Sequence, residues 1–187
     1  MQEQQYDWWG WEDPLLDTKQ IQMLNEVILN NYHYEEDQTH GATDSQGNYL
    51  KNIKPKNIRL KNMPALYDEI LDMAFHISYY KFGVVSFPKN VWDNLLYNVY
   101  SGDIKARYGE HHDSSRSWAF DAKLTFLLNL SPDEYEGGDL IINKRLTNFR
   151  KPGSAILFKS HLRHEVTPVT KGERITLTYF INGPKYQ

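Results

Sequence analysis

Cysteine is absent from all 187 residues of the chain. This absence excludes disulfide bonds, thiol catalysis and zinc sites with cysteine ligands. It leaves His, Asp and Glu as the side chains that can bind a metal ion. It is also compatible with a reducing, cytoplasmic setting, which we expect for this protein.

Long apolar runs and an excess of positive charge are missing as well. No stretch approaches the length of a membrane span, and the opening MQEQQYDWWGWED lacks the cationic and apolar pattern of a secretion signal. The formal net charge is -3 and the isoelectric point is near 6.2. Proteins that bind the nucleic-acid backbone are usually more basic. We therefore expect neither a membrane nor a nucleic acid as a partner.

The length suits one domain, residues 1–187, with enough core to fold independently. Residues 1–92 are expected to be mainly helical and supportive. One helix is predicted to begin at Asp17, with Gln20 completing a capping box, and a second at Pro64. Helical spacing predicts two apolar faces. The first comprises Leu24, Val27, Ile28 and Tyr32, and the second Leu66, Ile70, Met73, Ala74 and Ile77.

Two other segments of this half are unusual in composition. Residues 38–49, QTHGATDSQGNY, are rich in Gly, Asn, Asp and Ser, which predicts an exposed loop. That loop is either a plain connection or a lid over an active site. Trp8, Trp9 and Trp11 are expected to cap the core, with a partner contact or a dimer interface as the alternatives. Both a monomer and a homodimer remain open.

Short strand-like segments replace the helical pattern from about residue 93 to the end of the chain. They read LLYNVY, KARYGEHHD, AKLTFLLNL, DLIIN, SAILF, HEVTPV and RITLTYFIN, and glycine-containing turns separate them. Seven or eight short strands with tight turns favour a sandwich or barrel over a parallel α/β sheet. We therefore expect residues 93–187 to form a mainly β core.

Two metal-ligating side chains stand two residues apart in this region, His111 and Asp113. Alternate residues of a strand share a face and lie roughly 7 Å apart at the backbone, so both side chains can reach one ion. His112 points the other way and is the poorer ligand. His164 supplies a second imidazole, and spacing favours it over His161. Two imidazoles and one carboxylate, with other positions open, form the arrangement associated with Fe(II) oxygenases.

Arg174 follows His164 by ten residues, across a Thr-Lys-Gly turn. Within RITLTYF, alternation places Arg174, Thr176 and Thr178 on one face and the apolar residues on the other. An inward-facing arginine is costly unless it meets an anion, and guanidinium geometry favours a bidentate carboxylate. We expect adjacent antiparallel strands to bring Arg174 into the cavity of His164. An internal pair with Asp or Glu is the alternative.

Three stretches between Tyr97 and Phe180 resemble the 2-oxoglutarate and Fe(II)-dependent dioxygenases, specifically their prolyl 4-hydroxylase-like branch of bacterial and phage proteins. They read YNVYSGDIKARYGEHHD, AKLTFLLNLSPDEYEGGDL and PGSAILFKSHLRHEVTPVTKGERITLTYF. The resemblance implies a mainly β fold with N-terminal helices, in which a double-stranded β-helix (a jelly-roll or cupin-like fold) forms the catalytic core.

The resemblance also implies roles for individual residues. His111, Asp113 and His164 resemble the iron ligands. Arg174 resembles the residue that binds the C5 carboxylate of 2-oxoglutarate, and Thr176 sits where a hydroxyl often joins that contact.

Further positions match the family less specifically. Tyr100 and Tyr108 occupy aromatic positions that either bind the co-substrate or pack the barrel. Asn129 stands where related hydroxylases often place a co-substrate-binding tyrosine. Arg116 and Trp118 follow the first ligands in SSRSWAF and are candidates for substrate contact.

The implied cofactors are Fe(II), 2-oxoglutarate and O2, with an ascorbate requirement left open. The implied reaction is hydroxylation of a C–H bond, with proline in a peptide or protein as first choice and release of succinate and CO2. The setting would be the cytoplasm of a bacterial or phage-infected cell. Asp113 argues against halogenation, because halogenases of this superfamily lack that carboxylate.

Three alternatives remain beside proline hydroxylation. One is hydroxylation of a free amino acid or other small molecule. A second is a nucleobase dioxygenase, which Phe180 disfavours because those enzymes carry a further arginine at that position. The third, from a different class, is a non-catalytic jelly-roll binding module.

Overall fold

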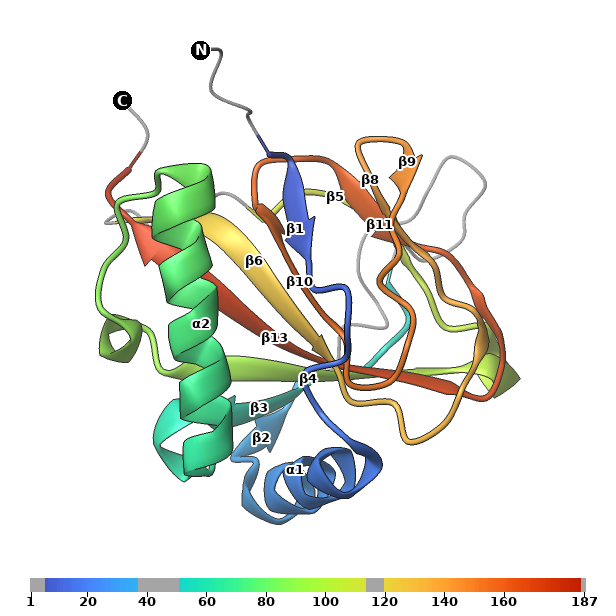
Figure 1. Ribbon diagram of the computed structural model, residues 1–187. Coiled ribbons are helices and arrows are strands. Elements are labelled where there is room, and N and C mark those ends of the chain that lie inside the picture. The colour runs from blue at the N-terminus through green and yellow to red at the C-terminus, as the bar shows by residue number, and fades with distance from the viewer. Residues whose placement is uncertain (1–5, 37–50, 114–119, 186–187) are drawn as a thin grey trace.

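Two facing antiparallel sheets form the centre of the computed structural model, which describes residues 6–36, 51–113 and 120–185 (Figure 1). The large sheet contains, in spatial order, β1 (Trp8–Gly10), β10 (Ala155–Lys159), β6 (Asp121–Asn129), β13 (Glu173–Gly183), β4 (Asn94–Ser101), β3 (Lys56–Arg59) and β2 (Tyr34–Glu35). The small sheet contains β5 (Tyr108–His111), β11 (His164–Val166), β8 (Leu140–Ile142) and β9 (Arg145–Leu146). A separate pair joins β12 (Val169–Lys171) to β7 (Glu136–Gly137).

The chain passes back and forth between these sheets from β5 onward. Strand β5 belongs to the small sheet, β6 to the large one, β8 to the small one, β10 to the large one, β11 to the small one and β13 to the large one. This alternation is the winding of a double-stranded β-helix. The structure confirms the mainly β fold with N-terminal helices.

Two α-helices pack on the large sheet, α1 (Thr18–Asn31) and α2 (Ala65–Phe82), with α2 in front of β6 and β13 in Figure 1. The capping box at the start of α1 is confirmed, because Asp17 Oδ1 accepts from Gln20 N at 2.9 Å and Gln20 Oε1 accepts from Asp17 N at 2.9 Å. Three 3-10 turns complete the helical content of the described residues: η1 (Leu60–Asn62), η2 (Lys89–Val91) and η3 (Gly102–Ile104). None of the described helices is long and apolar enough to span a membrane.

The apolar faces predicted for the helices were partly wrong. On α1, Leu24 and Ile28 are buried as expected, but Tyr32 is 40% exposed because it follows the last helical turn with extended backbone angles. On α2, Ile70 and Ala74 are buried, whereas Met73 is 41% exposed. The buried stripe of α2 is Tyr67, Ile70, Leu71, Ala74 and Ser78. It shares Ile70 and Ala74 with the predicted stripe, and its centre is rotated by about 70° around the helix axis.

Alternation along β13 separates the two environments of the large sheet, as predicted. Ile175, Leu177 and Tyr179 are buried against the helices in the outer core. Arg174 and Thr176 face the space between the sheets. One strand therefore contributes both to the support layer and to the interior of the barrel.

The tryptophan-rich segment closes the edge of the large sheet. β1 pairs with β10 in antiparallel register, with Trp8 opposite Phe158. Trp11 packs edge-on against Phe126, with ring centroids 6.1 Å apart. Trp8 and Trp11 therefore pack against the two cores, as expected for a segment that caps them.

The N-terminal segment packs closely against the β core at Gly153, so a larger residue at this position should destabilise the protein. This residue has a φ of +77°, and a Cβ placed on it would lie 2.2 Å from the Leu16 carbonyl oxygen. Gly153→Ala is expected to lower the free energy of unfolding by about 3 kcal/mol, from backbone strain and displacement of that carbonyl together.

The matched control is Gly83→Ala at the end of α2. Gly83 has a φ of +61°, but nothing lies within 4 Å of an added Cβ, so only the strain of about 1 kcal/mol is expected. Urea unfolding of both variants measures the difference. Equal losses would show that Leu16 is not held against Gly153.

Candidate metal centre and its cavity

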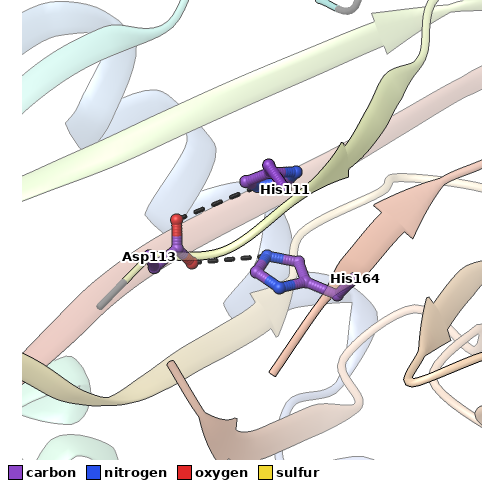
Figure 2. A group of neighbouring side chains, drawn as sticks. All are labelled: His111, Asp113 and His164. Atoms are coloured by element: carbon purple, nitrogen blue, oxygen red, sulfur yellow. Dashed lines mark ion pairs between the residues drawn. The ribbon is translucent and has the colours of Figure 1, made fainter. Parts of the chain in front are cut away.

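Three potential metal ligands converge between the two sheets (Figure 2). His111 is the last residue of β5, Asp113 follows two residues later, and His164 opens β11 directly opposite His111. His111 Nε2 lies 3.8 Å from Asp113 Oδ1, and His164 Nε2 lies 3.3 Å from Asp113 Oδ2. One ligand atom of each residue lies within 4.8 Å of the others, a spacing that a single ion can bridge.

Backbone carbonyl groups fix the tautomer of both imidazoles. His111 Nδ1 lies 2.8 Å from Gly109 O, and His164 Nδ1 lies 2.9 Å from Leu162 O. A carbonyl oxygen only accepts, so each Nδ1 carries the proton and each Nε2 presents a lone pair to Asp113. Electron-rich atoms thus face one another without a proton between them. A bound cation would satisfy all three groups.

The surroundings keep His111 neutral, the form that binds a metal. Burial, and to a smaller extent the neighbouring His164, lowers the pKa of His111 to about 4, although Asp113 acts in the opposite direction. Tyr108 stacks on the His111 ring with centroids 3.5 Å apart and an interplanar angle of 12°. The ring is therefore held by stacking on one face and by its hydrogen bond at Nδ1.

Asp113 is oriented by two buried hydroxyl residues. Thr125 Oγ1 donates to Asp113 Oδ2 at 3.0 Å and lies 2.9 Å from Ser160 Oγ. The backbone N–H of Asp113 donates to the Ser160 carbonyl oxygen at 2.8 Å. Sequence reasoning did not assign these supporting roles. The feature that could have indicated them is a polar residue, Thr125, within the otherwise apolar strand segment LTFLL.

Removal of the Thr125 hydroxyl should weaken metal binding without disrupting the fold. Thr125→Val has nearly the same shape, and loss of such a supporting hydrogen bond typically costs about 10- to 100-fold in metal affinity. Thr178→Val is the matched control, because its hydroxyl bonds to Asn98 in the same cavity instead of to a ligand. Competition titration of Fe(II) or Mn(II) measures both. Equal affinities for Thr125→Val and the unmodified protein would contradict this role.

Arg174 is buried with its charge only partly accommodated. The residue is 1% exposed, and its Nε and Nη2 find no hydrogen-bond partner among the residues that the structure describes. Its Cζ lies 5.0 Å from the Tyr100 ring centroid and 5.7 Å from that of Phe149. Within the same described residues no carboxylate pairs with Arg174, so the alternative of an internal ion pair gains no support. A carboxylate ligand would satisfy the orphaned nitrogens.

Tyr100 remains protonated beside this guanidinium. Burial raises the pKa of Tyr100 to about 12, although Arg174 opposes the change. Its hydroxyl is therefore available as a hydrogen-bond donor at neutral pH.

One cavity of about 110 Å³ joins the ligand cluster to Arg174. The predicted site residues on its wall are His111, Asp113, His164, Arg174, Thr176, Tyr100 and Tyr108. The expectation that β11 and β13 are adjacent antiparallel strands was wrong, because they belong to different sheets. His164 and Arg174 share the cavity because the two sheets face each other.

The structure does not place Asn129 among the residues that could bind the co-substrate, contrary to expectation. This residue does not line the cavity, and its side chain is engaged elsewhere. Asn129 Nδ2 donates to Arg150 O at 2.9 Å and to the Tyr135 hydroxyl at 3.3 Å, while its Oδ1 accepts from Ser131 N at 3.0 Å. Asn129 therefore ties down the segment that follows β6.

Lys51 is a cavity residue that the sequence did not reveal. It is 9% exposed, and its Nζ lies 4.4 Å from the Tyr108 ring centroid. A backbone bridge between Lys51 and Tyr108 places it on the cavity wall. No local motif surrounds it, so only the tertiary structure brings it beside His111.

The remaining predicted positions fall outside this cluster or outside the described residues. His112 and His161 are exposed, and neither belongs to the ligand group found among the described residues. Arg116, Trp118 and the segment 38–49 lie outside the part of the chain that the structure describes.

Comparison with known proteins finds similarity to one family in the C-terminal half of the chain. A sequence profile described as "2OG-Fe(II) oxygenase superfamily" matches residues 95–182. A PKHD-type hydroxylase of Nitrosomonas europaea is 34% identical over 99 residues, covering 47% of this chain and 43% of that protein. The match likewise covers 47% of a PKHD-type hydroxylase of Sphingopyxis alaskensis, so the chain spans about half the length of these relatives.

Solved structures show the same fold at low sequence identity. The viral collagen prolyl hydroxylase of Paramecium bursaria Chlorella virus-1, in its 2OG complex, has a TM-score of 0.66 and 16% identity, covering 96% of this chain and 97% of that one. A Trichoplax adhaerens prolyl hydroxylase in complex with a peptide fragment has a TM-score of 0.63 and 15% identity, covering 94% of this chain and 83% of that one. These likenesses support the jelly-roll assignment.

Proposed function

We propose that the chain is a 2OG-Fe(II) oxygenase of the prolyl 4-hydroxylase-like type that hydroxylates proline in a peptide or protein. The reaction would consume 2-oxoglutarate and O2 and release succinate and CO2. The observation that carries the proposal is the presence, in one cavity, of a His-Asp-His cluster and a buried arginine with unsatisfied nitrogens.

Each cavity residue has a defined task in this proposal. His111, Asp113 and His164 would hold Fe(II) on one face and leave the other positions open. Arg174 would bind the C5 carboxylate of 2-oxoglutarate through its free nitrogens, with the Thr176 hydroxyl beside it on the same strand.

The remaining wall residues orient the co-substrate and exclude water. Tyr100 would donate a hydrogen bond near Arg174, and Tyr108 would fix the His111 ring by stacking. Leu127 and Phe158 form apolar wall that excludes water from the reacting centre. Bound iron, with 2-oxoglutarate and O2, would supply the oxidising chemistry that no side chain provides.

The names of the relatives support a peptide substrate. They are PKHD-type hydroxylases and prolyl hydroxylases, and one neighbouring structure contains a peptide. We extend that substrate class to this chain. An ascorbate requirement and a cytoplasmic location belong to the same proposal, as does the use of residues 1–92 to support a single catalytic domain.

Succinate formation tests the proposal. Anaerobically Fe(II)-loaded protein is given 2-oxoglutarate and air, with and without proline-containing peptides, and His164→Ala is the control. We expect succinate to rise with peptide, a product heavier by one oxygen atom, and loss of both in the variant. Succinate formation indifferent to peptide would refute the prolyl substrate. No succinate despite bound iron would favour the binding module.

A further inference from the structure

A second pocket, of about 430 Å³, lies outside the metal cavity and has walls of two kinds. One wall is apolar and comes from the segment after α2, with Val84 and Val85. The other is basic, with Lys123 from β6 and Lys159 from β10, and Lys185 beyond β13. None of the described residues that line it is acidic.

Hydrogen bonds connect this basic wall to the metal-ligand segment. Ser160 follows Lys159, and its N–H donates to the Lys123 carbonyl oxygen at 3.0 Å. The Ser160 carbonyl oxygen accepts from the N–H of Asp113 at 2.8 Å. One residue therefore contacts both the pocket wall and the ligand segment.

Strand β6 also connects the pocket wall to the metal ligands. Lys123 and Thr125 are two residues apart on this strand, which is roughly 7 Å at the backbone. Thr125 Oγ1 in turn lies 3.0 Å from Asp113 Oδ2. The pocket wall is thus separated by roughly 7 Å of backbone from the residue that orients Asp113, a distance that about two residues of an extended chain span.

The charges that face the pocket sum to a positive value. Lys123 is only 8% exposed, and burial lowers its pKa while Asp121 acts in the opposite direction. Partial burial also lowers the pKa of His161, which favours its neutral form. Three lysines therefore face two nearby carboxylates, Asp7 and Asp121, neither of which lines the pocket. A partly buried cationic wall of this kind is stabilised by an anion.

We propose that this pocket is a substrate subsite that binds an acidic side chain of an extended peptide, about two or three residues from the one that is hydroxylated. This inference rests on the proposed function and specifies its substrate class. Lys123, Lys159 and Lys185 contact the carboxylate, and Val84 and Val85 contact the aliphatic part of the peptide. A nucleic acid is a poorer occupant, because the chain has a net charge of -3.

Peptide binding to the metal-free protein tests the subsite independently of turnover. The probes are two N-terminally labelled nonapeptides with central proline, identical except that glutamates at the second and third positions on both sides of proline are replaced by glutamines. Fluorescence polarisation at low salt should show at least 10-fold tighter binding of the glutamate peptide. Added salt should reduce that preference.

Charge reversal locates the contact. The double variant with Lys159→Glu and Lys185→Glu should lose at least 10-fold in affinity for the glutamate peptide. Lys19→Glu, an exposed reversal on α1, is the matched control and should bind as the unmodified protein does. Equal binding of both peptides, or equal losses in the double variant and the control, would overturn the inference.

The same peptides separate this inference from the proposed function. Hydroxylation of both peptides with equal kcat/KM and equal affinity would refute the acidic subsite and leave the prolyl hydroxylase intact. Preferential binding of the glutamate peptide without any succinate formation would refute the proposed reaction and leave the subsite. A single-stranded oligonucleotide that competes as well as the glutamate peptide would overturn the peptide assignment.

Discussion

Arg174→Met is expected to raise the KM for 2-oxoglutarate by about 100-fold and to stabilise the metal-free protein. The guanidinium is 1% exposed, and its Nε and Nη2 have no hydrogen-bond partner among the described residues. Loss of a charge-assisted, bidentate contact to a carboxylate costs about 2–5 kcal/mol, which corresponds to this change in KM. Replacing a poorly satisfied buried charge with an apolar side chain of similar length is expected to stabilise by about 1–3 kcal/mol.

The substitution is expected to weaken co-substrate binding while it stabilises the folded protein, and this combination makes the prediction specific. Thermal unfolding measures the change in stability, and 2-oxoglutarate titration of succinate formation measures the change in KM. Arg174→Lys is the matched control, because it retains the charge and loses the fork geometry, so its KM should fall between the other two. An Arg174→Met protein with unchanged KM would show that the co-substrate carboxylate binds elsewhere.

Asp113→Asn is expected to abolish Fe(II) binding at concentrations that saturate the unmodified protein, and turnover with it. The substitution preserves shape but removes the negative charge that faces the Nε2 lone pairs of His111 and His164. The loss of Fe(II) affinity should exceed the roughly 10- to 100-fold expected for Thr125→Val. Asp113→Asn removes a metal ligand, whereas Thr125→Val removes only a hydrogen bond to that ligand.

Two measurements separate metal binding from folding in this variant. Fe(II) titration reports affinity, and urea unfolding of the metal-free protein should show no large loss of stability. Asp133→Asn, an exposed carboxylate in the segment after β6, is the matched control and should bind iron normally. Stoichiometric Fe(II) binding by Asp113→Asn would contradict the assignment of the ligand set.

Local patterns predicted the parts of the site that lie on single strands. Alternation along β13 placed Arg174 and Thr176 on the interior face, and two-residue spacing placed His111 beside Asp113. The inference for β13 holds because strand geometry repeats every two residues, whereas Asp113 lies two residues beyond the end of β5 and reaches His111 from there. The capping box at Asp17 is equally local.

Tertiary packing decided the features that the sequence did not reveal. β11 and β13 are near in the chain but belong to different sheets, and that choice depends on the whole barrel. Asn129 shares an alternation pattern with Thr125, yet its amide bonds to the segment that follows. Lys51 reaches the cavity through a bridge to Tyr108, 57 positions away in the chain. No local periodicity records such contacts.

The most direct test of the central claim is an anaerobic titration of 2-oxoglutarate into the Fe(II)-loaded protein, followed by visible absorbance. A metal-to-ligand charge-transfer band reports chelation of the iron by the keto acid. We predict a band that saturates at one equivalent, is absent in His164→Ala, and needs far more 2-oxoglutarate in Arg174→Met. Stoichiometric iron binding without any such band, or a band unaffected by either substitution, would contradict the account.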